Sequence, residues 1–177
     1  MNWGAPYDSG ALDLIEKKWS FAFPPDLRDL LLSRRPLGDG FVDWENDPDD
    51  HIRRRLGWPL DGLLFDVDHG FWLPEWGDRP DDPSGRAEIV KCHVANAPKL
   101  IPICGHRYIS ELPKARNNPI LSVYQTDIIV CGGALGAYFQ SDHRISLDFH
   151  FQTEDYNAVP FWDRIAEWHF EHWEPET

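Results

Sequence analysis

Residues 98–139, PKLIPICGHRYISELPKARNNPILSVYQTDIIVCGGALGAYF, decide the fold, because they concentrate the β-branched residues that favour a packed, pleated surface. Four short apolar runs are predicted to be strands: residues 100–104, 107–109, 120–124 and 128–131. Gly105 and a polar loop over residues 113–119 separate them, and Gly132-Gly133 releases the chain into a short helical segment. We predict an α+β fold with a mostly antiparallel sheet flanked by helices.

The residues before this stretch predict helices and one more strand. Leu12, Ile15 and Trp19 form an apolar helical stripe after a cap at Ser9, and Pro25 opens a second helix of leucines. A third short helix is expected from about residue 47 to Leu56, because Gly57 is typical of a helix end. Residues 62–68 then predict a strand, with Phe65 and Val67 inward and Asp66 and Asp68 outward.

The residues that flank the main stretch complete the predicted elements. Residues 86–97 predict a helix, and Pro160 is expected to begin the last one, with Phe161, Ile165 and Trp168 toward the core. Residues 145–151 alternate in polarity and predict an edge strand or a loop.

Several of these phrases resemble the SUKH superfamily, which holds a yeast cell-wall synthesis regulator and many bacterial toxin-immunity proteins. They are Leu100-Ile101-Pro102-Ile103 with Gly105-His106-Arg107-Tyr108, the run over residues 118–127, and the helix opening over residues 23–31. The chain departs from the family pattern at Gly38-Asp39-Gly40. The resemblance implies an α+β fold and a protein-binding role without catalysis, and it carries over no catalytic residue.

Length and composition limit the class of protein. A chain of 177 residues with 42% hydrophobic content can bury a real core, so we expect residues 1–177 to form one domain. No run approaches the roughly 18 apolar residues of a membrane span, and the first residues lack a signal-peptide pattern, so a cytoplasmic protein is expected. Cys92, Cys104 and Cys131 predict reduced, buried thiols rather than a disulfide framework.

Charge is distributed unevenly along the chain. Of the net −13, residues 39–82 carry 13 acids against four arginines, whereas residues 83–139 carry six bases against three acids. Such a field repels nucleic-acid backbones and anionic lipid and steers a basic partner toward the protein. An acidic surface that only keeps the chain in solution is the alternative interpretation.

The acidic stretch also contains tryptophans in loops, and aromatic anchors ringed by charges are typical of protein interfaces. We therefore predict a partner-binding surface; its members are Trp44, Asp47, Asp49, Asp50, Asp66, Asp68, Trp72, Trp76, Asp78, Asp81 and Asp82. The competing interpretation is that the aromatic rings cover the core.

Catalytic patterns are weak, and we expect no cofactor. His169 and His172 are three residues apart on the last helix and could hold a metal with Glu171 or His150, but no HExxH pattern occurs. Cys104 or Cys131 beside His106 would need an activating third group.

A polar cleft at the strand ends is a further possibility. Arg107, Tyr108 and Asp127 could line it, and a buried Arg107–Asp127 pair that joins two strands explains the same residues.

The sequence thus predicts a non-enzymatic protein-binding module. On the resemblance, it is an immunity protein that neutralises a basic toxin of the polymorphic or contact-dependent kind by direct binding. The alternatives are a regulatory scaffold of the cell-wall-regulator type and, less favoured, a metal-dependent hydrolase. Neither nucleic acid nor membrane is an expected partner, and the oligomeric state stays open.

Overall fold

A computed structural model describes residues 1–145, 147 and 156–172. The predicted sheet is confirmed: β3 (Leu100–Cys104), β4 (Arg107–Ser110), β5 (Ile120–Tyr124) and β6 (Asp127–Gly132) pair in that order, and each pair is antiparallel. A separate two-stranded sheet joins β1 (Asn2–Gly4) to β2 (Arg35–Leu37).

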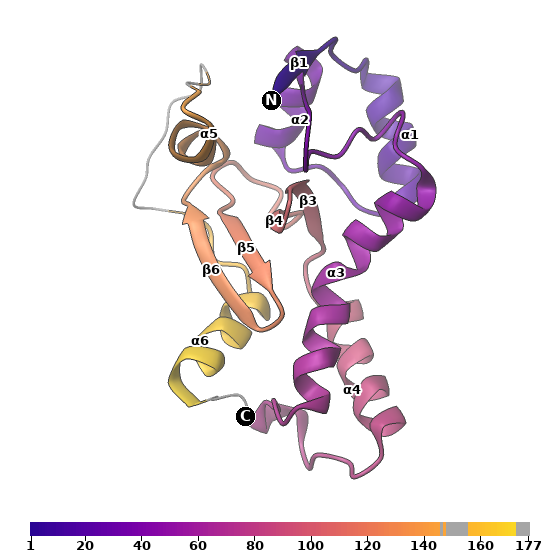
Figure 1. Ribbon diagram of the computed structural model, residues 1–177, viewed down its shortest axis with the longest axis vertical. Coiled ribbons are helices and arrows are strands. Elements are labelled where there is room, and N and C mark those ends of the chain that lie inside the picture. Colours follow the sequence, from indigo (N-terminus) through magenta and orange to yellow (C-terminus); the bar gives the residue numbers. More distant parts are fainter. Residues whose placement is uncertain (146, 148–155, 173–177) are drawn as a thin grey trace.

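Helices surround the four-stranded sheet, so the predicted α+β class is confirmed (Figure 1). They are α1 (Ser9–Trp19), α2 (Pro25–Ser33), α3 (Asp49–Asp68), α4 (Pro83–Asn96), α5 (Leu135–His143) and α6 (Trp162–His172), with a 3-10 turn η1 (Pro74–Trp76). The cap of α1 is Asp8, which accepts a hydrogen bond from the backbone of Ala11, and not Ser9 as expected. No helix in the described part of the chain has the length and apolarity needed to cross a membrane.

The sheet separates two hydrophobic cores, because successive side chains along a strand point to opposite faces. Ile101 and Ile109 pack into the core that α1, α2 and α5 share. Tyr108 and Val123 pack into the core formed with α3, α4 and α6. Strands β3, β4 and most of β5 are therefore buried on both faces, whereas Ile129 and Val130 of the edge strand β6 are exposed.

The prediction for residues 57–68 was wrong. Gly57 does not end the third helix, and residues 62–68 are the last turns of α3 instead of a strand. Consequently Asp66 is buried beside Val67, whereas Phe65, expected inward, is 51% exposed.

Pro59 lies inside α3, and the sheet compensates for the hydrogen bond that it removes. Proline has no N–H to donate to the carbonyl four residues earlier, which is that of Arg55. The hydroxyl of Tyr108 on β4 donates to this carbonyl at 2.8 Å. A tertiary contact thus lets the helix continue, and it fixes α3 against β4.

The buried Tyr108 hydroxyl predicts a loss of stability in alkali. Burial raises the pKa of Tyr108 to about 12, whereas in the unfolded chain a tyrosine has a pKa of about 10. The native state then holds the proton that the unfolded state has lost, so its stabilisation is complete below pH 10 and is lost as the pH rises toward 12.

We expect the free energy of unfolding, measured with urea, to fall between pH 10 and pH 12, with Tyr108 alone contributing roughly 2 kcal/mol of the fall. The variant Tyr108→Phe should fall less steeply, because Cys131 and Tyr138, whose pKa values burial also raises, still contribute. Equal slopes for the two proteins would contradict the role of Tyr108.

Candidate partner-binding surface

The acidic residues predicted from the sequence fall into two groups at opposite ends of α3. Asp47, Asp49 and Asp50 lie at its start, and Asp68 lies at its end. A 20-residue helix is about 30 Å long, so the acidic stretch does not form one surface.

The group at the start of α3 is largely engaged within the chain. Asp47 accepts a hydrogen bond from the backbone of Asp43, and Asp50 pairs with Arg53. Asp49 pairs with Lys18 on α1 at 2.7 Å, and this hydrogen bond lowers the pKa of Asp49. Acids in a first turn also suit the positive end of the helix dipole. A structural role accounts for this group.

The second group lies at the end of α3 and in the loop that connects α3 to α4. We call Asp68, Asp78, Asp81 and Asp82 the acidic end; all four are exposed. The buried Arg86 holds them close, because its guanidinium binds Asp68 at 3.0 Å and also the carbonyls of Pro80 and Asp81. Residues 61–86 contain seven acids against Arg79 and Arg86, so this end keeps a net negative charge.

Asp66, predicted to face a partner, is instead 1% exposed. Its carboxylate accepts hydrogen bonds from the backbone N–H of Thr126 at 2.9 Å and from the Thr126 hydroxyl at 2.5 Å. Because the hydroxyl has one hydrogen and donates it to Asp66, Nδ1 of His169, 2.8 Å away, is placed to donate to that oxygen. This network joins α3, the β5–β6 turn and α6.

Two of the three predicted tryptophan anchors are core residues. Trp44 is buried edge-on against Phe21 and Phe23. Trp76 is buried against Trp72. Trp72 itself is only partly exposed, and its Nε1 donates to the carbonyl of Gly77. The competing interpretation, that the rings of residues 69–82 cover the core, is correct for Phe71 and Trp76, and Trp44 is buried as well.

Three exposed aromatic side chains lie elsewhere, on α3 and the β5–β6 hairpin; two others in the described part of the chain, Tyr156 and Phe170, lie before and on α6. Trp58, Phe65 and Tyr124 are 44%, 51% and 56% exposed, and we call them the aromatic face. Trp58 and Phe65 are seven residues apart, which places them on one side of α3 about 10 Å from each other. The ring centroids of Trp58 and Tyr124 are 6.3 Å apart. This face was not predicted, because residues 57–68 were expected to form a helix end and a strand.

Gly62 explains why the hairpin lies so close to α3. A Cβ added there would lie 2.9 Å from the Cα of Gln125, which is nearer than side chains tolerate. The small residue lets the β5–β6 turn rest on the helix. Trp58 also donates through Nε1 to the carbonyl of Val123 at 3.0 Å, so its ring is held in place before any partner arrives.

A cleft of about 320 Å³ adjoins the aromatic face. It is lined by Arg55, Trp58, Gly105, His106, Tyr108 and Tyr124. Burial and the neighbouring Arg107 and Arg55 cations lower the pKa of His106, so its ring is neutral at pH 7.

Of the predicted polar cleft, only Tyr108 lines this one. Arg107 is on the opposite face of β4, where it donates to Ser122 and lies 3.7 Å from Asp142. Asp127 is exposed at the start of β6, so the predicted buried Arg107–Asp127 pair is wrong.

The predicted catalytic groups do not assemble into a site within the described residues. Nδ1 of His169 is hydrogen-bonded to the Thr126 hydroxyl, whereas the His172 ring stacks on Trp168. No group of three or more His, Cys, Asp or Glu in residues 1–145, 147 and 156–172 is arranged to hold a metal, and His150 lies outside the described residues.

The three cysteines are free thiols, as predicted, but Cys92 is exposed. Burial raises the pKa of Cys104 and, to about 11, that of Cys131, which disfavours the reactive thiolate.

Comparison with known proteins finds no family model, no curated protein and no solved structure that matches this chain.

Proposed function

We propose that this chain is a protein-binding module that neutralises a basic toxin by direct binding, as the resemblance to SUKH immunity proteins implies. The observation that carries the proposal is the aromatic face, which lies along α3 and leads to the acidic end. The aromatic face supplies apolar surface that is buried on binding, and the acidic end supplies the electrostatic attraction that guides association.

The aromatic face supplies the short-range contact energy of the interface. Exposed apolar patches of this kind mark interaction sites, and tryptophan and tyrosine are the commonest hot-spot residues. Because Trp58 is already bonded to Val123 and packed on Tyr124, little side-chain freedom is lost on association. Burial of these rings would govern the dissociation rate.

The acidic end supplies the long-range electrostatic attraction of a basic partner. Asp68 pairs with Arg86 and Asp82 caps α4, but Asp78 and Asp81 form no ion pair with a described residue; with Asp61 on the same side of α3 as Trp58, they favour approach of a positively charged surface. Toxins that act on nucleic acids carry such a surface because they must bind phosphates. A basic nuclease domain is therefore the partner that the charge fits best.

Association with the product encoded beside this chain's gene tests the proposal. With that protein immobilised, we expect the association rate constant to fall about tenfold or more between low and high salt, because the Debye length shrinks from about 30 Å at 0.01 M to 3 Å at 1 M. The dissociation rate should change little, and the toxic activity should be inhibited at one-to-one stoichiometry.

The variant Asp78→Asn/Asp81→Asn is expected to slow association. Lys17→Gln and Lys114→Gln serve as controls with a charge change outside the acidic end. Absence of binding at low salt, or binding without inhibition, would overturn the proposal.

A further inference from the structure

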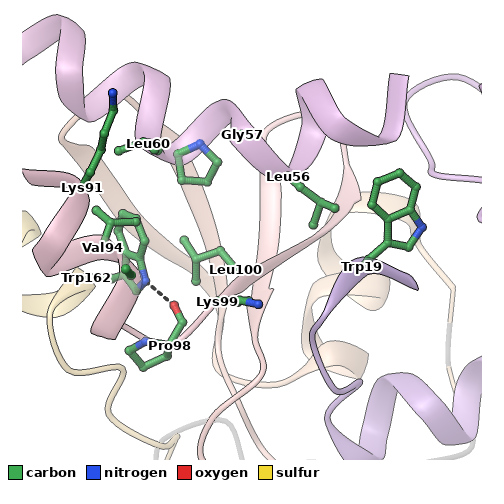
Figure 2. Close-up of a pocket in the computed structure, with 12 residues that line it drawn as sticks. Trp19, Leu56, Gly57, Leu60, Lys91, Val94, Pro98, Lys99, Leu100 and Trp162 are labelled. Carbon is green, nitrogen blue, oxygen red and sulfur yellow. Dashed lines mark hydrogen bonds between the residues drawn. The ribbon is translucent and has the colours of Figure 1, made fainter. Parts of the chain in front are cut away.

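A second hollow lies on another side of α3, where the two hydrophobic cores meet (Figure 2). We call it the seam hollow; its volume is about 330 Å³, and it is lined by Trp19, Leu56, Gly57, Pro59, Leu60, Lys91, Val94, Ala95, Pro98, Lys99, Leu100 and Trp162. Leu56 packs at the edge of the core on the α1 side, whereas Leu60 and Val94 belong to the other core. Neither core fills the space between them.

The walls of the seam hollow are mainly apolar. Leu56 and Leu60 approach from α3, Val94 from α4, and Leu100 from β3 (Figure 2). The indole of Trp162 donates through Nε1 to the carbonyl of Pro98 at 2.8 Å, so its polar atom is satisfied. An apolar chain can therefore lie against Trp162 without leaving its N–H unpaired, whereas the buried Nε1 of Trp19, which also lines the hollow, has no hydrogen-bond partner among the described residues.

Two lysine side chains are among the residues that line this apolar space. Lys91 projects from α4, and Lys99, just before β3, donates to the carbonyl of Ser20 (Figure 2). Neither lysine forms an ion pair with any described residue, although the chain has 30 acids for 17 lysines and arginines. Carboxylates lie nearby without pairing with either ammonium group: Glu111 accepts a hydrogen bond from the backbone N–H of Lys99, and the Asp61 carboxylate lies beside Gly57.

We propose that the seam hollow binds a small amphipathic monocarboxylate, such as a medium-chain fatty acid. Its alkyl chain would lie against Leu56, Leu60 and Val94, and its carboxylate would pair with Lys91 or Lys99. The volume is in the range of small-molecule sites, about 300–1,000 Å³, and is too small for a folded partner. This proposal is independent of toxin binding, because the aromatic face is made of other residues.

Titration with sodium decanoate, followed by calorimetry, tests the site. The wild-type chain should bind one decanoate, and 1-decanol, which has the same chain without the charge, should bind about tenfold more weakly. Lys91→Gln/Lys99→Gln should lose about tenfold in affinity for decanoate, whereas Lys114→Gln, on an exposed loop, should bind as the wild type does.

A blocking variant locates the bound molecule. A Cβ at Gly57 would meet only the Asp61 carboxylate, at 3.5 Å, so Gly57→Leu can be accommodated and would occupy part of the hollow. We expect this variant to keep its unfolding temperature and lose decanoate binding. Unchanged decanoate affinity in Gly57→Leu or in the double lysine variant, equal affinity for decanol, or no binding by the wild type would each overturn the proposal.

Discussion

Trp58→Ala is expected to weaken binding of the toxin partner by about 30-fold or more, mostly through faster dissociation. Trp58 is the centre of the aromatic face, because it contacts Tyr124 and lies on the same side of α3 as Phe65. Truncation removes the largest ring of the aromatic face and also the hydrogen bond to Val123 that fixes it. Surface plasmon resonance at constant salt separates the dissociation rate from the association rate.

A matched control distinguishes a lost anchor from a general loss of exposed apolar surface. Leu14 on α1 is 69% exposed and lies outside the aromatic face, so Leu14→Ala should bind as the wild type does. Trp72→Ala should have the smaller effect of the two tryptophan variants, because Trp72 is already packed on Trp76. Wild-type dissociation in Trp58→Ala, with circular dichroism unchanged, would exclude the aromatic face as the binding site.

The difference between the predicted and observed anchors has a physical cause. Trp44 and Trp76 occur among prolines, glycines and acids, which is the composition of a surface loop, yet both rings are buried. Burial of a loop aromatic depends on what packs beside it, and for Trp44 these are Phe21 and Phe23 from an earlier loop. Local composition carries no information on such contacts.

Residues 57–68 show how two signals of helix termination can mislead. Gly57 and Pro59 usually end a helix, and Phe65-Asp66-Val67-Asp68 alternates like a strand. The buried residues of α3, however, recur at helical spacing, namely Ile52, Pro59, Leu63 and Val67. What overrode the proline was the hydroxyl of Tyr108, which is 49 positions away and could not be read from the local pattern.

The sheet was predictable because its signal is local. Residues 98–139 combine β-branched runs with glycine and proline turns, and these fix both the strands and their antiparallel order. The charge asymmetry was also readable, but its division between the two ends of α3 required the helix to be known. The acidic part of the candidate site was thus predictable from the sequence, whereas its exposed aromatic residues were not.

Asp66→Ala should lower the free energy of unfolding by about 2–4 kcal/mol, the largest stability effect expected of a single acidic residue here. Asp66 is 1% exposed and satisfies both the N–H and the hydroxyl of Thr126, which is itself fully buried. Alanine would leave these groups without an acceptor and would remove the link through Thr126 to His169 on α6. Urea unfolding, followed by tryptophan fluorescence, measures the change through the transition midpoint.

The control for this variant is Asp61→Ala, because Asp61 is an exposed residue of the same helix. Its free energy of unfolding is expected to stay within about 0.5 kcal/mol of the wild-type value. Asp66→Asn should lie between the two, because the amide oxygen can still accept from Thr126 but no longer carries the charge that strengthens the hydrogen bonds. A loss below about 0.5 kcal/mol in Asp66→Ala would show that the network does not hold the β5–β6 turn on α3. If instead the loss is large, the position of Tyr124 beside Trp58 depends on a carboxylate that contacts neither ring, and the shape of the aromatic face is set from inside the protein.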